Sequence, residues 1–463
     1  MYEKEIERFA EDHIDELLKD LKALIRTDSS RTDALPGMPY GEGPAKALAQ
    51  GEELFHKYGF KCTRYDGRAI AADISDLPAG LDILAHLDVV PGGTGWTVTE
   101  PFEPVVRDGK IYGRGSSDDK GPALAALYAM RAVKELGIPL KSNVRLILGG
   151  DEECGSSDIE YYFEREPHAP MTVSPDADYP VIHAERGLTD VTFSAEAETG
   201  EMLSFTSGEK FNMIPASACF TVKGADAGEI EAASEKLGMP VKVETAPVPG
   251  GIKVTVTGEG GHSSTPDLAR NALTASLALI SALPLSGETA NLLKGLSRMF
   301  PFGDHHGGAA GIDMSDAESG RITASLNMLT MKDGRLTGVV DCRVPVCATE
   351  DNCAGVLRSG FEGIGFTVDD CLITPVHNVP SDSPFVKTLI GCYEKITGCS
   401  GEPLAIGGGT YCHDIPNGVA FGCAVPGVDN RMHGPDEFML VSVLKDSVRI
   451  YADAIVELCG AAE

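Results

Sequence analysis

Two neighbouring carboxylates stand in a short glycine-bounded loop, where residues 113–121 read Gly-Arg-Gly-Ser-Ser-Asp118-Asp119-Lys-Gly. Adjacent acids repel each other and a tight loop restricts both side chains, so a multivalent cation would balance them. Asp118 opens the Asp-Asp-Lys-Gly turn and could offer one oxygen to each of two ions. The loop therefore predicts a metal site, although an exposed turn with solvated acids explains the same residues taken alone.

Further hard ligands occur at four other places in the chain, each beside a turn. They are His86 with Asp88, the pair Glu152 and Glu153, Asp176, and His433. Oxygen and imidazole ligands without a thiolate suit zinc, manganese or cobalt at a hydrolytic site. Each one alone has a plainer explanation, such as a strand-end histidine, a surface acidic pair or a turn acid. Their joint occurrence favours a metal centre.

In each of the two pairs, His86 with Asp88 and Glu152 with Glu153, the spacing suggests that the two residues have separate tasks. In an extended segment, His86 and Asp88 point to the same side, so the carboxylate can orient the imidazole. Of Glu152 and Glu153, one can bind metal while the other takes a proton from an attacking water and delivers it to a leaving nitrogen.

The chain around these residues alternates between strand-like and helix-like segments. Apolar runs at 80–86 and 143–149 each end beside a candidate ligand, and a helix over Pro122–Leu136 separates them. This alternation predicts an α/β fold with a mainly parallel sheet flanked by helices. Ligands of such sheets collect beyond the carboxyl ends of the strands, where the candidate residues stand.

The character of the sequence changes after residue 187. Apolar and polar residues alternate over 189–197 and 251–257, as in half-exposed antiparallel strands, and the α/β style returns from about 377. We therefore expect a catalytic domain in two parts, 1–187 and 377–463, with an inserted α+β lid domain at 188–376.

Composition excludes several classes of partner. The 463 residues include 69 acids against 39 lysines and arginines, and the net charge of -30 repels nucleic acids. No apolar run is long enough to cross a membrane, and the N-terminus lacks the order of a signal peptide. The 12 cysteines are scattered without a Cys-x-x-Cys pair. We expect a cytoplasmic protein with reduced thiols.

Five segments together resemble the signatures of the co-catalytic dinuclear metallopeptidases, the family of aminoacylase, carnosinase and succinyl-diaminopimelate desuccinylase. They are Leu-Ala-His86-Leu-Asp88-Val-Val-Pro, Gly-Arg-Gly-Ser-Ser-Asp118-Asp119-Lys-Gly-Pro, Asp-Glu152-Glu153-Cys-Gly-Ser, Ser-Pro-Asp176-Ala and Met-His433-Gly-Pro. The longer matches, including Gly-Gly-Gly-Thr-Tyr411, are most similar to bacterial dipeptidases of PepV type. The similarity spans nearly the whole chain, with the middle third matching at short islands. The family pattern also implies a cis peptide bond between Asp118 and Asp119.

The resemblance implies a zinc-exopeptidase-like catalytic domain that holds two divalent metal ions, zinc in the first place and manganese or cobalt as alternatives. One ion would take His86 and Asp176, and the other would take Glu153 and His433. Asp118 would bridge the two ions.

The resemblance also assigns the groups around the metals. Glu152 would be the general base and Asp88 the partner of His86. From the lid, His262 would donate to the developing oxyanion, with help from Asn212, and Arg343 would hold the substrate carboxylate. Taken without the resemblance, His262 also fits a surface turn and Arg343 a solvated strand end.

These residues predict a metal-dependent dipeptidase that hydrolyses the amide bond of short peptides through a water activated by two metal ions. An N-acyl-amino-acid deacylase or desuccinylase would use the same chemistry on another acyl group, and a non-catalytic binding protein on a hydrolase fold is a further alternative. The resemblance to dipeptidases of PepV type, in which an enlarged lid completes the site within one chain, implies a monomer for an insertion of this length, and a dimer stays an alternative.

Overall fold

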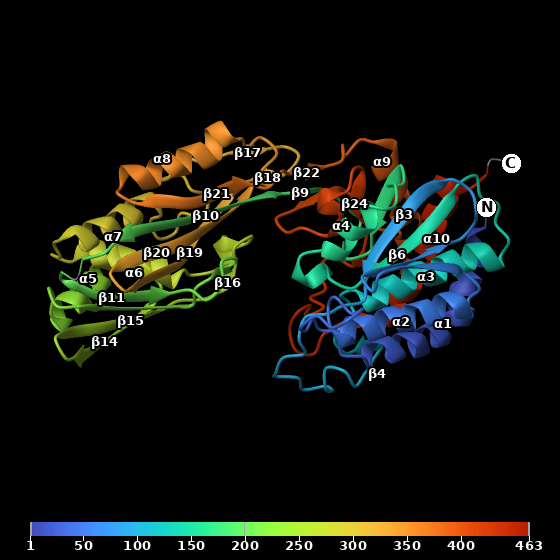
Figure 1. Cartoon of the computed structure of the whole chain (residues 1–463), viewed down its shortest axis with the longest axis horizontal. Coiled ribbons are helices and arrows are strands. Elements are labelled where there is room, and N and C mark those ends of the chain that lie inside the picture. The colour runs from blue at the N-terminus through green and yellow to red at the C-terminus, as the bar shows by residue number, and fades with distance from the viewer. Residues whose placement is uncertain (1, 199, 462–463) are drawn as a thin grey trace. The chain divides into compact units, whose positions relative to one another are not determined.

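The apolar segments that end beside candidate ligands become neighbouring strands in the computed structural model, which describes residues 2–198 and 200–461. Contacts within the chain divide it into two units (Figure 1). The larger unit comprises Met1–Ala184, Asn378–Leu404 and Gly409–Glu463, and the smaller unit comprises Glu185–His377 and Ala405–Gly408. The chain therefore passes between the units four times.

The larger unit is built on a nine-stranded sheet in the order β1-β2-β6-β3-β7-β24-β9-β22, with β23 also paired to β9. Its four central strands, β6, β3, β7 and β24, run parallel, whereas β1, β2 and β9 pair in antiparallel fashion. The strands are β1 (Lys61–Tyr65), β2 (Ala69–Asp73), β3 (Ala79–His86), β6 (Asn143–Gly149), β7 (Met171–Ser174), β9 (Val181–Glu185), β22 (His377–Asn378), β23 (Pro403–Ile406) and β24 (Gly418–Ala420). The predicted α/β fold class is confirmed, with antiparallel strands added at the flanks of the parallel centre.

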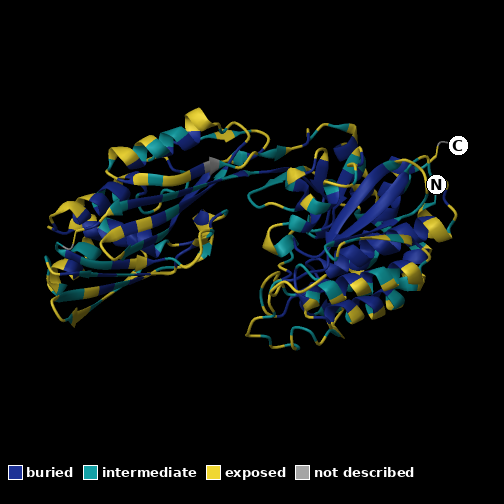
Figure 2. Ribbon diagram, viewed as in Figure 1, coloured by how far each residue is buried: buried dark blue, intermediate teal, exposed yellow. Residues whose placement is uncertain are grey.

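Helices cover this sheet because both of its faces are apolar. The core on one face joins α1, α2, α3, α9 and α10 to the sheet, and a smaller cluster on the other face includes residues of α4. The helices are α1 (Glu3–Ile25), α2 (Glu42–Lys57), α3 (Lys120–Glu135), α4 (Ser157–Phe163), α9 (Pro384–Thr397) and α10 (Val441–Cys459). Figure 2 shows β3 and β6 as buried along their length, as continuous apolar runs require.

Short strands and helical turns complete the larger unit. They are β4 (Val105–Arg107), β5 (Lys110–Tyr112) and β26 (Phe438–Leu440) in one small sheet, β8 (Ala177–Asp178) with β25 (Cys423–Ala424), and the turns η1 (Glu152–Cys154) and η4 (Tyr411–Asp414). The predicted helix after the acidic loop is α3, which begins at Lys120 rather than Pro122. The first turn of this helix therefore follows Asp119 directly.

The smaller unit is an eight-stranded antiparallel sheet in the order β14-β15-β13-β11-β19-β20-β10-β21. One apolar core joins it to α6, α7 and α8. Its elements are β10 (Gly187–Glu196), β11 (Met202–Ser207), β13 (Ser217–Val222), β14 (Lys242–Val248), β15 (Gly251–Thr257), β19 (Thr323–Lys332), β20 (Arg335–Val344), β21 (Thr367–Ile373), α5 (Ala227–Leu237), α6 (Ala272–Ala282), α7 (Glu288–Met299) and α8 (Gly355–Gly363).

Two small two-stranded sheets and two helical turns complete this unit. They are β12 (Met213–Ile214) with β16 (Gly261–His262), β17 (Ser315–Asp316) with β18 (Gly320–Arg321), and the turns η2 (Pro266–Leu268) and η3 (Glu350–Ala354). In the part of the chain that the structure describes, no helix is both long and apolar enough to span a membrane. All 12 cysteines are free thiols.

Candidate metal centre

The parallel strands bring three of the predicted segments to one edge of the sheet. His86, the last residue of β3, lies opposite Gly149 at the end of β6, so the turn that holds Glu152 starts beside it. Asp176 follows β7, whose last residue, Ser174, lies opposite the end of β24. All three segments leave carboxyl ends of parallel strands, which is where ligands of such sheets gather.

Asp118 lies in a loop whose backbone is fixed by a buried glutamate. Glu437 accepts three backbone N–H groups of this loop on one oxygen, from Gly115 at 3.0 Å, Ser117 at 2.9 Å and Asp118 at 3.3 Å. Its other oxygen accepts the Arg114 guanidinium at 2.6 Å. The loop therefore presents the Asp118 carboxylate in a set direction.

The other side of the same loop is held by Lys120. Its ammonium is fully buried and donates to the backbone carbonyls of Leu24 at 3.1 Å and Thr27 at 2.9 Å, at the end of α1. Burial lowers the pKa of this ammonium to about 7. The peptide bond between Asp118 and Asp119 is cis, as the resemblance implied.

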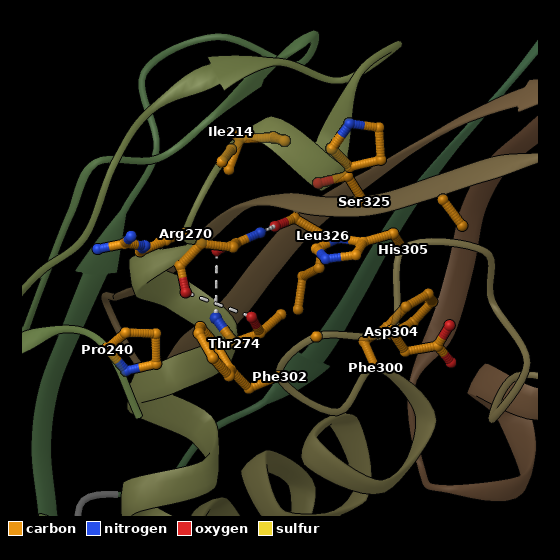
Figure 3. A pocket seen from close by; sticks show the side chains of 15 residues that line it. Ile214, Pro240, Arg270, Thr274, Phe300, Phe302, Asp304, His305, Ser325 and Leu326 are labelled. Carbon is orange, nitrogen blue, oxygen red and sulfur yellow. Dashed lines mark hydrogen bonds between the residues drawn. The ribbon is translucent and has the colours of Figure 1, made fainter. Parts of the chain in front are cut away.

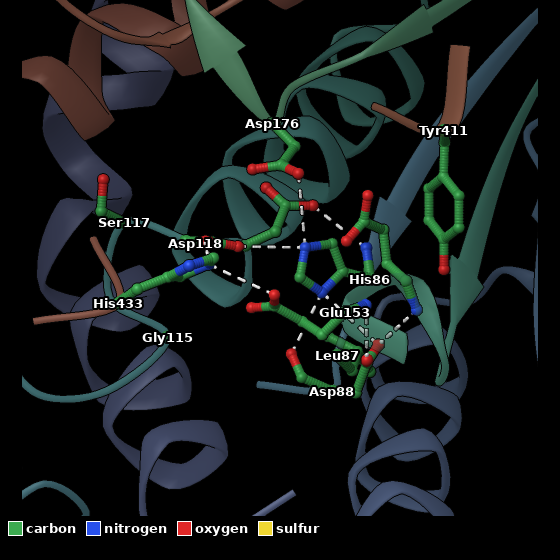
Figure 4. Close-up of polar contacts among 12 residues, drawn as sticks. His86, Leu87, Asp88, Gly115, Ser117, Asp118, Glu153, Asp176, Tyr411 and His433 are labelled. Atoms are coloured by element: carbon green, nitrogen blue, oxygen red, sulfur yellow. Dashed lines mark hydrogen bonds and ion pairs between the residues drawn. The ribbon is translucent and has the colours of Figure 1, made fainter. Parts of the chain in front are cut away.

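The two oxygens of Asp118 face different histidines (Figure 4). Oδ1 lies 3.1 Å from Nε2 of His86, and the same nitrogen lies 3.4 Å from Oδ2 of Asp176. Oδ2 lies 2.9 Å from Nε2 of His433, which also lies 3.2 Å from Oε2 of Glu153. Asp118 is thus shared by two groups, each of one histidine and two carboxylates.

The donor set of both groups fits a divalent cation. Within each group the potential ligand atoms lie within 4.8 Å of one another. Nε2 of His86 is buried and makes no hydrogen bond among the described residues, although the carboxylates of Asp118 and Asp176 lie within ion-pair distance of it. Hydrogen bonds to Asp118 and Glu153 raise the pKa of His433 to about 11, which reflects how strongly the carboxylates attract positive charge. Imidazole and carboxylate ligands suit zinc or manganese.

His433 approaches the group from an exposed loop. Its side chain is 57% exposed and its backbone φ is 61°, in the left-handed region that residues other than glycine rarely occupy. The carbonyl of the next residue, Gly434, accepts the Arg114 guanidinium at 3.1 Å, and Glu437 lies three residues further along the chain. The loop of His433 and the loop of Asp118 are therefore tied together by the same Arg114–Glu437 pair.

Asp88 supports the centre in two ways. Its backbone carbonyl lies 3.0 Å from Nδ1 of His86, whereas its carboxylate lies 3.5 Å from that nitrogen. The two carboxylate oxygens accept the backbone N–H groups of Glu152 and Glu153, each at 3.2 Å. Asp88 thus orients the imidazole mainly through its main chain and fixes the glutamate turn through its side chain.

Glu152 stands beside the two groups and belongs to neither. Burial raises the pKa of its carboxyl group well above the usual range, and the nearby charges of Asp176 and Asp118 raise it further. A carboxylate that is close to ligands without being one is placed to exchange protons.

In the smaller unit, the fold brings Asn212 and His262 together. His262 lies opposite Met213 in the β12–β16 pair, and the backbone carbonyl of Asn212 accepts the N–H of Ser263 at 3.1 Å. Nδ1 of His262 lies 2.7 Å from Oγ of Ser264 and accepts the Ser264 backbone N–H at 3.2 Å. Because Nδ1 is an acceptor, the proton of the neutral imidazole is on Nε2.

Arg343 lies near the end of β20 with most of its donors in use. Its Nε and Nη2 donate to the two oxygens of the buried Asp341, at 2.9 and 2.8 Å, and its Nη1 donates to the carbonyl of Gly407 at 3.2 Å. The predicted carboxylate-binding fork thus already carries an internal carboxylate.

A separate cavity of about 180 Å³ lies within the smaller unit (Figure 3). Arg270, Thr274, Phe302 and His305 are among its lining residues, and of the β12–β16 strand pair only Ile214 lines it. None of the predicted site residues lines this cavity.

A comparison with known families decides the relationship. The model of Peptidase family M20/M25/M40 matches residues 83–457, which is most of the chain. The chain belongs to this family. The resemblance drawn from the five segments is thereby confirmed, and the M20 chain is identified as a peptidase.

Relatives of this M20 chain match it over nearly its whole length. YtjP of Bacillus subtilis (strain 168) is 34% identical over 469 residues, with 99% of each chain covered. The Beta-Ala-Xaa dipeptidase of Lactobacillus delbrueckii subsp. lactis is 32% identical, with 97% of each chain covered. Human carnosine dipeptidase 1 shares the fold, with a TM-score of 0.59 at 16% identity over 99% of each chain.

Three residues escaped the sequence reasoning. Glu437 follows His433 by four residues, so an acid shortly after a candidate ligand was the available signal. Asp341 stands two residues before Arg343, on the same face of a strand. Arg186 gave no signal beyond its place at the expected domain boundary.

Proposed function

We propose that this M20 chain is a dipeptidase that uses two divalent metal ions, most simply zinc, with manganese or cobalt as alternatives. The observation that carries the proposal is the shared Asp118, whose two oxygens each face one histidine group. His86 and Asp176 would hold one ion and Glu153 and His433 the other. Ions bound there would polarise the substrate carbonyl and lower the pKa of water.

The residues of the chain would then handle the proton and the developing charge. A carboxylate oxygen of Glu152 takes the proton of the attacking water, and the resulting acid returns it to the nitrogen of the leaving amine. Asp88 keeps the backbone of Glu152 in place during both transfers, because it accepts that residue's N–H group.

The smaller unit would act as a lid that supplies the remaining groups. Nε2 of His262 carries the proton and can donate a hydrogen bond to the carbonyl oxygen as negative charge develops there. Asn212, beside it, would assist, and Arg343 would help to hold the substrate carboxylate. The expected domain boundaries, 1–187, 188–376 and 377–463, remain our proposal for the catalytic and lid domains.

The substrate class follows from the relatives and can be tested against a deacylase. Protein freed of metal by chelation should hydrolyse alanylalanine and β-alanyl dipeptides only after Zn²⁺, Mn²⁺ or Co²⁺ is added back. N-acetyl-alanine and N-succinyl substrates should react far more slowly. Faster hydrolysis of the acylated set would replace the dipeptidase by a deacylase, and metal-independent or absent hydrolysis of every substrate would reject the proposal.

A further inference from the structure

Two guanidinium groups of the smaller unit converge on Gly407. The Nη1 atom of Arg343 donates to the Gly407 carbonyl at 3.2 Å. A Cβ atom added to Gly407 would lie 3.8 Å from Nη1 of Arg186 and only 3.0 Å from Cβ of Ser264. We call Arg186, Ser264, Gly320, Arg343 and Gly407 the Gly407 corner.

Glycines also keep the other side of Arg186 open. A Cβ atom on Gly320 would lie 3.1 Å from Nη2 of Arg186, which is closer than side chains normally pack. Both terminal nitrogens of Arg186 are therefore bordered by glycine, one by Gly407 and the other by Gly320. The guanidinium is held in place from its inner end, because its Nε donates to the carbonyl of Ser319 at 2.9 Å.

The two arginines differ in how their charge is balanced. Arg343 is neutralised by the buried Asp341, which takes two of its donors. Among the residues that the structure describes, no carboxylate lies within ion-pair distance of Arg186. Its nearest acidic influence is Asp316, and the Asp316 oxygens are occupied by backbone N–H groups, including those of Ser319 and Cys347.

Burying a cation without a counterion costs free energy. Arg186 is half-buried, and desolvation lowers the pKa of its guanidinium from the ordinary value, in the direction expected for a positive charge that lacks a counterion. An anion placed against the two terminal nitrogens would relieve that cost. A carboxylate matches them best, since a guanidinium edge and a carboxylate form two parallel hydrogen bonds.

We propose that Arg186 is a specificity-determining residue that binds the C-terminal α-carboxylate of the peptide substrate at the Gly407 corner. The inference rests on the proposed dipeptidase function. Arg343 contributes the fixed wall of this corner, and Arg186 contributes the unbalanced charge.

The position of the corner relative to His262 explains why an α-carboxylate is favoured over another anion. Ser264, which packs against Gly407, is the residue that orients the imidazole of His262. In a dipeptide the α-carboxylate belongs to the residue that carries the leaving nitrogen, only a few bonds from the carbonyl that His262 would serve. An anchor so close to the donor therefore selects peptides with one residue after the scissile bond.

The test compares alanylalanine with its C-terminal amide, which lacks the carboxylate charge. Arg186→Gln should raise KM for alanylalanine about 10- to 100-fold, the loss expected for hydrogen bonds to a charged group. The kcat/KM for the amide should change much less, so that the preference for the free acid disappears. Arg186→Lys should retain part of the preference, because it keeps the charge without the paired donors.

The matched control is Arg321→Gln, which removes an exposed arginine of the same unit that pairs with Asp313. Its preference for the free acid should equal that of the wild type. Equal losses on acid and amide in Arg186→Gln, or no loss on either, would overturn the assignment. A loss confined to alanylglutamate would show that Arg186 reads an acidic side chain instead, and would also overturn it.

Failure of the proposed function gives a different result. If the wild type hydrolyses no dipeptide with any added metal, the dipeptidase proposal falls. Calorimetric titration of alanylalanine into the wild type and Arg186→Gln then still tests the carboxylate site. Equal affinity in the two proteins would reject it, and weaker binding by the variant would support it.

Discussion

The metal centre of the larger unit and the Gly407 corner of the smaller unit have opposite electrostatic problems. At the metal centre, carboxylates from distant segments are packed together around His86 and His433, and negative charge is in excess. At the Gly407 corner, Arg186 is half-buried without a carboxylate partner among the described residues. On the two proposals made above, the first region would receive cations and the second would receive an anion.

The two regions also differ in how firmly their groups are held. His86 is fully buried at a strand end, and the Asp118 and Glu152 backbones are each fixed by a carboxylate from another segment. His262 is exposed on a two-residue strand. This difference suggests a division of labour in which the larger unit performs the proton transfers, and the smaller unit positions the substrate and stabilises its developing negative charge.

The largest effect should come from removing the proposed base. Glu152→Gln should keep both metal ions and the fold, because the amide has the same shape, and should lower kcat by about 10²- to 10⁴-fold. Steady-state kinetics with metal analysis of the same sample measures both. Glu160→Gln, on the exposed side of α4, is the control and should behave like the wild type. Near-normal turnover in Glu152→Gln would remove proton transfer from this residue.

The next effect should come from the smaller unit. His262→Ala should lower kcat by about 10²- to 10³-fold, as loss of one oxyanion donor does, while the metal content stays unchanged. His305→Ala, which changes the separate cavity, should leave kcat unchanged. If His262→Ala instead raised KM alone, His262 would serve binding rather than the transition state, and charge stabilisation would no longer be a task of the smaller unit.

A smaller effect should come from the support of the metal centre. Glu437→Gln replaces a carboxylate that holds three backbone N–H groups around Asp118, and should weaken metal binding by about 10- to 100-fold, as is usual for groups behind metal ligands. Competition with a coloured chelator measures the change. Asp436→Asn is the control, since Asp436 bonds to Thr97 and Val98 instead. Unchanged affinity in Glu437→Gln would show that the loop holds its shape without this charge.

The smallest effect concerns Glu16, an acid that is paired with cations and does not lie among other carboxylates. Glu16 receives Arg131 at 2.8 Å and Lys57 at 3.2 Å, and although burial alone would raise its pKa, these cations lower it to about 2. Because the folded pKa lies below the unfolded value near 4.5, the stabilisation is present above pH 4.5 and is lost as the pH falls towards 2.

Glu16→Gln should therefore lower the free energy of unfolding by about 1 kcal/mol at pH 7, a value reduced for solvent screening because the side chain is 36% exposed. The difference from the wild type should shrink as the pH falls below 4.5. Urea unfolding followed by the fluorescence of Trp96, the single tryptophan, reports on the larger unit. Glu53→Gln, at an exposed site on α2, should show no such pH dependence. A constant difference at all pH values would contradict the pairing.

The sequence predicted the elements better than it predicted their neighbours. The strand over 143–149 has the expected bounds, because an uninterrupted apolar run is a local signal. The acidic loop predicted a cation site. Its contact with Glu437, more than 300 residues away in the sequence, could not be predicted because it depends on how the strands pack. The resemblance supplied the pairing of His86 with Asp176, which spacing alone left open.

The smaller unit was predicted less completely for a physical reason. Its candidate residues stand on turns and strand ends, where the role of a charge depends on its partner. Arg343 has the residue type of a substrate clamp, but Asp341, on the same strand face, already neutralises it. Arg186 has no motif, and only the packing of Gly407 and Gly320 against it reveals an unbalanced charge.

The short segment Ala405–Gly408 belongs to the smaller unit although the chain reaches it only after returning to the larger one. A recombinant fragment cut at Glu185 and His377 would keep the whole antiparallel sheet and its core, and would lack Gly407. Arg343 would lose its carbonyl acceptor in that fragment, and Arg186 would lose the carbonyl of Ile406 that its backbone N–H binds at 2.9 Å. Grafting this lid onto another hydrolase would therefore require a second, separately encoded strand.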